Sequence, residues 1–423
     1  MKDDKYFWRY EKEPGLVLDK EYLKKQENYE PLVSIITSYY NSNEFMNQTI
    51  NCVLNQTFPY WEWIIVDDGS TDKKAKDYLK EVEKIDTRIK IYHKENEGLA
   101  KGRDYAIKFS KANYILPLDA DDLIEKEYIE TLYWTLETNK KASWAFTNSV
   151  GFGKYIYLVD KPFDSDKMKS ENQITATALI RKEKILELGG YGVAKRYVNE
   201  DWHLWLRMLA KGDFPVQVDF YGFWYRRRKD SLLSKINDDK KEENELRLRD
   251  LKIEADKIKE KVNPIIYPKE ENCKFEYIKL DWNKKIVSNK KTIVYVIKNI
   301  ETDSMFYKNL KNINKNAVII CMENSKHSQY VARQMYENYA EVFNLPTFLD
   351  KKYFQGFIKY IIETRNVEEI YTVAEYKNLE VLNVAKELKY KENHFKYELK
   401  ILIYKVKHTL LGRAIRKFVR TLK

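Results

Sequence analysis

The chain of 423 residues has few cysteines and no long hydrophobic run. Its three cysteines, Cys52, Cys273 and Cys321, lie far apart without a CxxC pair. This argues against a disulfide framework or a structural zinc site and fits a reducing cytosol. No apolar run approaches the roughly 18 residues that span a bilayer, and the N-terminus lacks the apolar stretch of a signal peptide. We therefore predict a cytoplasmic protein, peripheral on the inner face of the cell membrane.

Glycine is scarce in the second half of the chain. Of 13 glycines, 11 precede Phe223, and only Gly356 and Gly412 follow it. Tight turns and close approach of the backbone to phosphate favour glycine, so phosphate binding is expected in the first half. No glycine occurs between Gly15 and Gly69. This argues against a nucleotidyltransferase, because those enzymes begin with a Gly-rich phosphate loop.

Aromatic side chains and positive charge are abundant. The chain contains 33 Tyr, 18 Phe and 9 Trp, so apolar surface does not limit burial, and its length favours two domains with appendages. The net charge is +11, and residues 391–423 alone hold ten Lys or Arg residues against two Glu. Most of the excess charge therefore lies in one terminal segment, and we predict no nucleic-acid partner.

Apolar runs that predict strands alternate with amphipathic runs that predict helices in the first half. Strands are predicted at 32–37, 61–66, 89–93 and 114–118, and helices at 45–54, 73–84 and 99–110. Such alternation favours an α/β fold with a largely parallel sheet covered by helices.

An acidic cluster, Asp119-Ala120-Asp121-Asp122, directly follows the last of these strands. Open α/β sheets place their ligands at this carboxyl end. Three carboxylates within four residues repel one another unless a cation lies between them, and Mg²⁺ or Mn²⁺ suits carboxylates combined with phosphates. Asp residues also cap helix N-termini, so this motif alone leaves a metal site and a helix cap open.

Other motifs stand around the acidic cluster in a fixed order. They are Tyr40-Asn41 after the first strand, the helix and loop Thr49–Gln56, Val66-Asp67-Asp68-Gly69-Ser70, Leu118–Asp122 and Glu200-Asp201. Together these five resemble the family 2 glycosyltransferases, which are inverting enzymes with the GT-A fold. The resemblance covers about residues 30–230 and rests on the order of the motifs, since each one alone is weak.

The resemblance implies a role for each matched position. Asp201 would be the general base, and Asp121, with Asp119, would ligate Mn²⁺ or Mg²⁺ at the diphosphate. Asp122 keeps the simpler role of a helix cap. The implied donor-binding residues are Ser38, Tyr40, Asp68, Arg103 and Asp119. Many members of the family carry Pro at the position of Ser38 and Asn at that of Asp104, so the preferred base stays open.

The chemistry of a nucleotide sugar needs groups of these kinds. Breaking the anomeric bond leaves a diphosphate whose charge a metal neutralises, and the acceptor hydroxyl needs a carboxylate to take its proton. One base opposite the leaving group gives inversion, whereas double displacement uses a second carboxylate as nucleophile. Asp201 could instead cap a helix, but Glu200, Trp202 and Trp205 beside it favour catalysis. The aromatic pair would line an acceptor site, and Trp205 could equally belong to the core.

Three further features have simpler interpretations. The run Tyr225–Arg228, with Arg226 as the candidate, would clamp the diphosphate or form a solvated basic face. His203 is expected to be a helix residue without a ligand, and Cys52 a core residue.

The second half of the chain begins with a highly charged stretch. Apolar residues recur in it at helical spacing, namely Leu248, Leu251, Ala255, Ile258 and Val262. This predicts an amphipathic connecting helix, for which packing against a domain is favoured over dimerisation. Strands at 293–297, 317–321, 341–343 and 369–373 then predict a smaller Rossmann-like domain. It lacks a Gly-rich loop and should not bind a dinucleotide.

The terminal segment is predicted to be a basic amphipathic helix. One stripe is apolar and consists of Leu399, Ile403, Val406, Leu410, Ala414, Phe418 and Leu422. Basic residues occupy most of the remainder, which is typical of a helix lying on an anionic membrane. The alternative is a helix docked on its own domain.

The sequence thus predicts a GT-A domain at 1–230, a helical linker at 231–285, a Rossmann-like α/β domain at 286–390 and a membrane-associating helix at 391–423. The predicted function is inverting transfer from a nucleotide-diphosphate sugar, with UDP favoured, to a hydroxyl of a lipid-linked or polysaccharide acceptor. This activity would serve bacterial-type cell-surface glycan synthesis. The alternative is a catalytically inactive GT-A-like assembly or scaffold protein at the membrane, and a homodimer is compatible with either.

Overall fold

The structure is a computed structural model, and it divides the chain into two compact units. One unit comprises residues 1–269 with 347–349, and the other comprises 270–346 with 350–423. The residues whose structure is described are 13–19, 22–26, 29–192, 199–228, 241–269, 278–284, 286, 288, 290–299, 316–324, 340–372 and 374–382.

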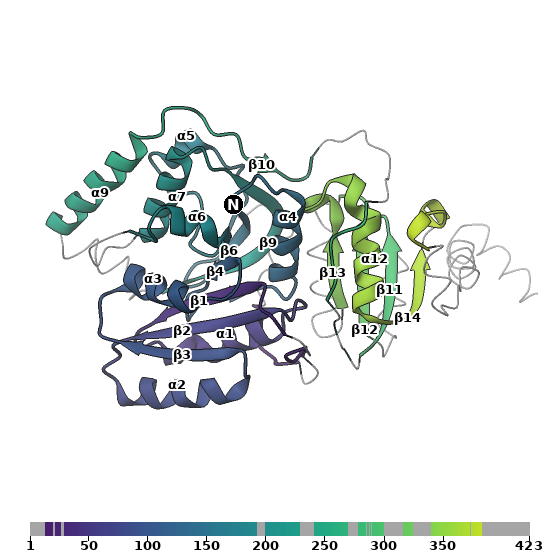
Figure 1. Cartoon of the computed structure of the whole chain (residues 1–423), viewed down its shortest axis with the longest axis horizontal. Coiled ribbons are helices and arrows are strands. Elements are labelled where there is room, and N and C mark those ends of the chain that lie inside the picture. Colours follow the sequence, from purple (N-terminus) through teal and green to yellow (C-terminus); the bar gives the residue numbers. More distant parts are fainter. Residues whose placement is uncertain are drawn as a thin grey trace, which may run out of the picture. The chain divides into compact units, whose positions relative to one another are not determined.

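The first unit is built on a mixed ten-stranded sheet (Figure 1). Its main path runs β10-β9-β6-β8-β4-β1-β2-β3, with β5 paired to β9 and β7 paired to β6. The strands are β1 (Val33–Tyr39), β2 (Trp61–Asp68), β3 (Ile89–Lys94), β4 (Tyr114–Pro117), β5 (Leu123–Ile124), β6 (Trp144–Gly153), β7 (Tyr157–Val159), β8 (Leu179–Arg181), β9 (Pro215–Arg227) and β10 (Ile265–Ile266).

Strands β1 to β4 form the parallel half of this sheet. The prediction of a largely parallel sheet is correct for this half. The other half is mixed, because β9 runs parallel to β6 and to β10 while other pairs are antiparallel. There β8 runs antiparallel to both β4 and β6, and β5 and β7 are also antiparallel to their partners. Hairpin-type pairings need no helical crossover, so the helix–strand alternation of the first 118 residues gives no sign of them.

Every strand and helix predicted between residues 32 and 118 is present, with ends that differ by a few residues. Helix α2 shows the local causes, because Asp72 accepts a capping hydrogen bond from Lys74 N (2.9 Å) and Leu79 and Val82 face the core. The helices of the first unit are α1 (Asn43–Leu54), α2 (Lys73–Ile85), α3 (Leu99–Phe109), α4 (Tyr128–Thr138), α5 (Ser165–Met168), α6 (Lys182–Glu187), α7 (Glu200–Ala210) and α9 (Lys241–Ala255).

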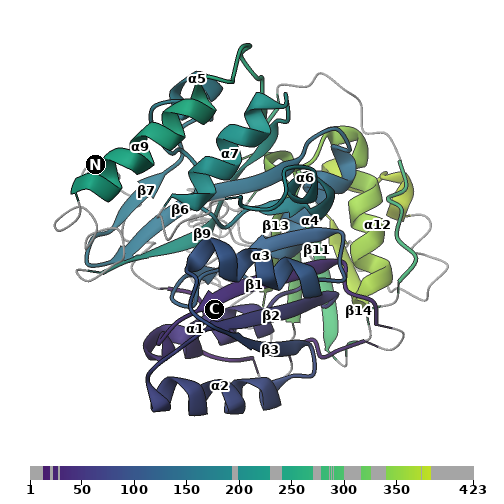
Figure 2. The ribbon, with the colours of Figure 1, turned by 60° about the vertical axis from the view of Figure 1, so that its left-hand side comes forward.

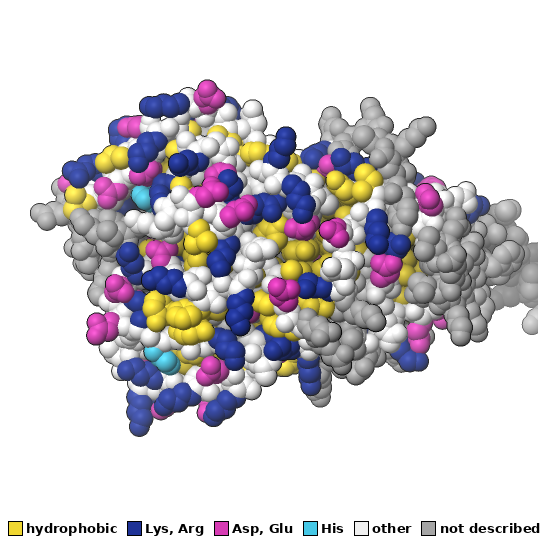
Figure 3. Space-filling view, viewed as in Figure 1, with side chains coloured by type: hydrophobic (Ala, Val, Ile, Leu, Met, Phe, Trp, Pro, Cys, Tyr) yellow, Lys and Arg dark blue, Asp and Glu magenta, His cyan; other side chains and the backbone are white. Residues whose placement is uncertain are grey.

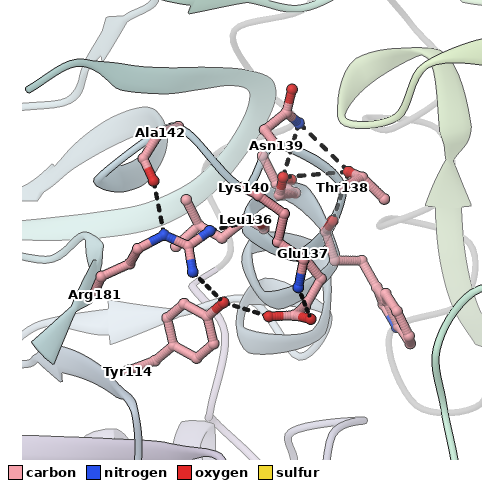
Figure 4. Close-up of polar contacts among 10 residues, drawn as sticks. Tyr114, Leu136, Glu137, Thr138, Asn139, Lys140, Ala142 and Arg181 are labelled. Atoms are coloured by element: carbon pink, nitrogen blue, oxygen red, sulfur yellow. Dashed lines mark hydrogen bonds and ion pairs between the residues drawn. The ribbon is translucent and has the colours of Figure 1, made fainter. Parts of the chain in front are cut away.

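A polar cluster anchors the start of β4, at the end away from the acidic residues (Figure 4). Arg181 of β8 donates to the Tyr114 hydroxyl, to Ala142 O and to Leu136 O, each at 2.8 Å. The same hydroxyl donates to Glu137 of α4. Burial, followed by the charge of Glu137, raises the pKa of Tyr114, so the hydroxyl stays protonated and fixes β4 against β8 and α4.

Helix α9 packs along α7 in the first unit (Figure 2). Leu251, Ala255 and Ile258 are buried in the same core cluster as Leu204 and Trp205. This confirms packing against a domain. The prediction of one continuous apolar stripe is wrong, because α9 ends at Ala255 and the side chain at position 248 is 52% exposed.

Replacing Leu251 with Ala is expected to lower the free energy of unfolding by about 2–5 kcal/mol, because a buried leucine leaves a cavity when truncated. Leu248→Ala on the same helix is the matched control and should change it by no more than about 0.5 kcal/mol. Urea unfolding of the two variants measures the difference. Equal midpoints would mean that α9 is not docked on the core.

The second unit contains a four-stranded parallel sheet in the order β13-β12-β11-β14. Strands are therefore present at each of the four places where the sequence predicts them. Their bounds are β11 (Lys291–Ile297), β12 (Asn316–Cys321), β13 (Ala340–Asn344) and β14 (Asn366–Thr372), and helix α12 spans Phe354–Thr364. The predicted terminal helix at 391–423 lies outside the described residues. None of the helices searched, all within the described residues, is long and apolar enough to cross a membrane.

Charges of both signs are distributed over the described surface on the face seen in Figure 3. Lysine and arginine side chains are interspersed there with Asp, Glu and hydrophobic side chains. Helix α2 carries surface ion pairs of opposite charge, Lys80–Asp77 and Lys84–Glu81. This face therefore offers mixed charge to a partner and not a uniform basic field.

Candidate active site

The acidic residues form a turn at the carboxyl end of β4, next to β1. Leu118 N donates to Ile36 O (3.0 Å), and Thr37 Oγ1 donates to Leu118 O (2.6 Å). Asp122 N then donates to Asp119 O (3.2 Å) and closes the turn. We call residues 119–122 the acidic turn; the sheet fixes its start, where parallel α/β sheets bind ligands.

Arg103 of α3 joins the acidic turn to the start of α7. Its Nη2 donates to Asp119 Oδ1 (2.8 Å), and its Nη1 donates to Glu200. The guanidinium is 1% exposed and lies 5.5 Å from the ring centre of Tyr191. Burial lowers the pKa of Arg103, but the charges of Asp119 and Glu200 outweigh it and hold the pKa well above its ordinary value. The sequence motifs around 103, 119 and 200 thus meet through one buried cation.

The predicted catalytic residue Asp201 lies beside this cation, in the first turn of α7. One carboxylate oxygen accepts from Trp202 N (2.7 Å) and the other from Asn172 Nδ2 (3.1 Å). Burial raises the pKa of Asp201, although Arg103 and these donors oppose it. Burial and the charges of Asp201 and Asp119 also raise the pKa of Glu200 to about 7, although Arg103 opposes it. Two acidic groups with raised pKa values at one site are typical of proton-transfer chemistry.

Asp121 has features expected of a cation ligand. Its side chain is 22% exposed, and its Oδ2 lies 3.1 Å from Arg228 Nη2. Burial and the neighbouring Asp119 raise the pKa of Asp121, while Arg228 and Arg226 lower it. Carboxylate oxygens suit Mg²⁺ or Mn²⁺, and a cation here would share Asp121 with Arg228. Among the described residues no three His, Cys, Asp or Glu side chains are grouped to hold a metal, so a cation here would need further oxygens from substrate or water.

Asp122 does not cap a helix, contrary to the prediction. Strand β5 follows it, and α4 begins only at Tyr128. Its Oδ1 accepts from Arg226 N (2.8 Å), and burial with the charges of its two acidic neighbours raises its pKa well above the ordinary value. Asp122 therefore ties the acidic turn to β9.

Asp68 lies at the end of β2 with its carboxylate buried. It accepts hydrogen bonds from Gly98 N (2.7 Å), Glu97 N (3.1 Å) and Lys94 Nζ (2.8 Å). These bonds fix the loop that opens α3, the helix that carries Arg103. The structure thus gives Asp68 a structural task at the site, and its contact with a nucleotide base stays a prediction.

Ser38 and Tyr40 lie at the end of β1. The Tyr40 side chain is 45% exposed, so it is open to a ligand. Ser38 faces α3, where a Cβ added at Gly102 would lie 2.1 Å from Ser38 Oγ. Only glycine permits this close approach, which brings α3 and Arg103 against β1.

Arg226 and Trp202 have partners within the protein. Arg226 Nε donates to Asp121 O and its Nη2 to Gln48 Oε1, both at 2.8 Å. Trp202 Nε1 donates to Met168 O (2.7 Å), and its half-buried indole packs against the core. The predicted contacts of both residues with substrate are untested.

The remaining predictions concern core residues. Trp205 is fully buried and stacks on Trp144 (5.3 Å between ring centres), so it belongs to the core. Cys52 is buried, as predicted. His203 packs towards Glu254 of α9 (3.9 Å from Nε2 to Oε1), and burial lowers its pKa.

Comparisons with known proteins identify the family of the chain. Residues 34–189 match the family model described as glycosyl transferase family 2. TuaG of Bacillus subtilis (strain 168), whose name assigns it to teichuronic acid biosynthesis, is 33% identical over 194 residues, covering 44% of this chain and 75% of TuaG. The chain belongs to the family 2 glycosyltransferases.

Other similar proteins extend over comparable lengths. Glycosyltransferase GlyG of Streptococcus pneumoniae serotype 4 is 30% identical over 224 residues, covering 48% of this chain and 73% of GlyG. The solved structure of S. aureus TarS 1–349 in complex with UDP has a TM-score of 0.41 and 19% identity, covering 52% of this chain and 64% of that one. A TM-score of this size does not establish a shared fold.

The family match ends at residue 189, before helix α7. It includes Asp68, Arg103, Asp119 and Asp121 but stops before Asp201. Contacts within this chain join the matched residues to α7, namely Arg103–Glu200, Asn172–Asp201 and Met168–Trp202.

Two residues at this site are not identified by the sequence motifs. Asn172 binds Asp201, and Gln48 binds Arg226. Position 172 lies between predicted elements and belongs to no motif. Gln48 lies in a predicted helix, directly before the family motif Thr49–Gln56. Only the hydrogen bonds identify either residue.

Proposed function

We propose that the first unit is an inverting, metal-dependent glycosyltransferase that uses a nucleotide-diphosphate sugar, with a UDP-sugar favoured. The observation that carries the proposal is the buried Asp119–Arg103–Glu200 link. It ties the acidic turn to the start of α7 and so assembles a donor-side carboxylate pair and a candidate base in one site. Ser38, Tyr40 and Asp68 at the ends of β1 and β2 are the proposed nucleotide contacts.

Asp121 and Asp119 would hold Mn²⁺ or Mg²⁺, with the diphosphate completing the coordination. The cation would neutralise the charge that develops on the leaving diphosphate. Arg228 is one third exposed beside Asp121, so it is better placed than Arg226 to contact the diphosphate. Arg226 uses Nε and Nη2 within the protein.

Asp201 would take the proton of the acceptor hydroxyl as that oxygen attacks the anomeric carbon. The hydrogen bonds from Trp202 N and Asn172 hold its carboxylate in place, and Glu200 and Trp202 are proposed to border the acceptor. A single base of this kind supports direct displacement with inversion.

The proposed acceptor is a hydroxyl of a lipid-linked or polysaccharide glycan at the cell surface. The name of TuaG supports this class of product. Residues 391–423 would bring the enzyme to an anionic membrane, because their basic residues surround an apolar stripe.

The experiment that tests the proposal is a screen of several nucleotide sugars with the purified protein. Release of the nucleoside diphosphate, dependent on Mn²⁺ or Mg²⁺, is the expected result. If no nucleotide sugar is hydrolysed or bound with either cation, the inactive scaffold becomes the better account.

Transfer is expected to fall as the pH drops below about 7, where the raised pKa of Glu200 lies. Transfer falls in this direction because a general base acts only when it is deprotonated. The interacting carboxyl groups of Glu200 and Asp201 take up protons as the pH falls. The pH profile of kcat/KM measures this. Glu200→Gln removes one charge of the pair and should move the acidic limb to lower pH, whereas an unmoved limb would exclude the pair as its source.

Deleting residues 391–423 is expected to abolish co-sedimentation with anionic liposomes while leaving nucleotide binding by the first unit. Neutral liposomes are the control, because the proposed attraction is electrostatic. If the truncated protein still sediments with anionic liposomes, the segment has no membrane role.

A further inference from the structure

A chain of hydrogen bonds connects the N-terminal segment 13–19 with the acidic turn. Gln48 Nε2 donates to Pro14 O (2.9 Å), and Gln48 Oε1 accepts from Arg226 Nη2 (2.8 Å). Arg226 Nε in turn donates to the carbonyl oxygen of Asp121 (2.8 Å). Three consecutive bonds therefore lead from this segment to the backbone of the proposed metal ligand.

The rest of segment 13–19 is bound by the same face of α1. Asn51 Nδ2 donates to Gly15 O (3.0 Å), and Asn55 Nδ2 donates to Val17 O (2.9 Å). Asn55 Oδ1 also accepts from Asp19 N (2.9 Å). Side chains at positions 48, 51 and 55 share a helix face, so three amides hold an irregular segment along the helix.

Gly15 allows this segment to approach α1 closely. Its φ is +74°, and an added Cβ would lie 2.5 Å from both Gln48 O and Cys52 Sγ. A substitution here would strain the backbone and push the segment away from the helix.

Glutamine satisfies both partners at position 48. The Pro14 carbonyl needs a donor, and the Arg226 guanidinium needs an acceptor, so the amide has one orientation that serves both. Methionine of similar length would satisfy neither partner. Glutamate would keep the acceptor for Arg226 and lose the donor to Pro14.

The Arg226 side chain is restricted by several contacts, so a change in its bond to Gln48 should alter its bond to Asp121. Its guanidinium lies 4.4 Å from the ring centres of both Phe45 and Phe152, and its backbone N donates to Asp122 Oδ1 (2.8 Å). Contact with both rings favours this position of the guanidinium. The bond from Nη2 to Gln48 Oε1 fixes its orientation further and so helps to direct Nε at Asp121 O.

We propose that Gln48 is a positioning residue that orients Arg226 and thereby fixes the backbone of the acidic turn, while segment 13–19 holds Gln48 in place. The consequence for cation and diphosphate binding rests on the proposed function. The structural coupling does not, since it follows from the hydrogen bonds alone.

Amide hydrogen exchange of the full chain tests the coupling without any substrate. In Gln48→Met, the peptide that contains residues 119–122 is expected to exchange several-fold faster than in the unaltered protein, and Gly15→Ala should act in the same direction. Gln48→Glu keeps the acceptor for Arg226 and loses only the bond to Pro14, so it should exchange more slowly than Gln48→Met and faster than the unaltered protein. Asn47→Ala is the matched control, because Asn47 lies on α1 but binds Tyr78 and not Arg226. Unchanged exchange at 119–122 in a folded Gln48→Met protein would overturn the proposal.

Titration with UDP and Mn²⁺ adds a second readout. Outer residues that orient metal ligands typically change metal affinity about 10-fold or more. Gln48→Met should therefore weaken Mn²⁺-dependent UDP binding by about tenfold, and Gln48→Glu, which keeps the acceptor for Arg226, should weaken it less. Equal affinities in the two variants would contradict the positioning role. If the unaltered protein does not bind UDP with Mn²⁺, the proposed function fails, and hydrogen exchange still decides the coupling.

Discussion

Asp201→Asn is expected to lower sugar transfer by about 10²–10⁴-fold, the usual contribution of a general base, while leaving donor binding intact. Asparagine has nearly the same shape and can still accept from Trp202 N through its Oδ1. It cannot take up the proton of the acceptor. Transfer is measured by product formation, and donor binding by titration with the nucleotide sugar.

The control for this variant is Asp77→Asn on α2, which exchanges the same groups at a side chain that is 52% exposed. It should transfer sugar at the rate of the unaltered protein. Full activity of Asp201→Asn would remove Asp201 from the mechanism. Loss of donor binding in Asp201→Asn would instead point to a structural role at the donor site.

Arg103→Met is expected to lower the free energy of unfolding by about 3–5 kcal/mol and to abolish donor binding. The substitution removes the cation that lowers the pKa of Glu200, so this carboxyl, 5% exposed, must either take up a proton or stay charged without a partner. Breaking a buried ion pair from one side costs this much. Donor binding fails because Asp119 also loses its partner. Urea unfolding and nucleotide titration measure the two effects.

The double variant Arg103→Met/Glu200→Gln shows how much of the lost stability comes from the unpaired charge and how much from lost packing. Glu200→Gln alone should destabilise the protein, because Arg103 then has one carboxylate fewer. In the Arg103→Met background the same change should be neutral or stabilising, since it removes the uncompensated charge. Additive effects of the two substitutions would show that Arg103 and Glu200 do not interact.

The parallel half of the fold could be predicted from sequence because local signals agree there. Strand β2 is buried along its whole length, so its apolar run marks it clearly, and Asp72 marks the start of α2. The mixed half lacks such signals. Position 248 shows the limit of periodicity, because the spacing places it on the apolar stripe while the tertiary structure leaves it exposed.

The candidate site was predictable at the level of motifs but not of contacts. The order of the motifs places Arg103, Asp119 and Glu200 on the list of candidates, yet 97 residues separate Arg103 from Glu200, and spacing does not reveal which side chains meet. Asp122 shows the same limit. It was expected to cap a helix, but β9, about a hundred residues later in the chain, provides its partner.

The most direct test of the account is calorimetric titration of the full chain with UDP, in the presence of Mn²⁺ and again with a chelator. We predict binding that requires Mn²⁺ in the unaltered protein and is lost in Asp121→Asn, because Asp121 is the proposed metal ligand at the diphosphate. UDP binding of equal strength with the chelator, or undiminished binding by Asp121→Asn with Mn²⁺, would contradict a metal-dependent donor site at the acidic turn.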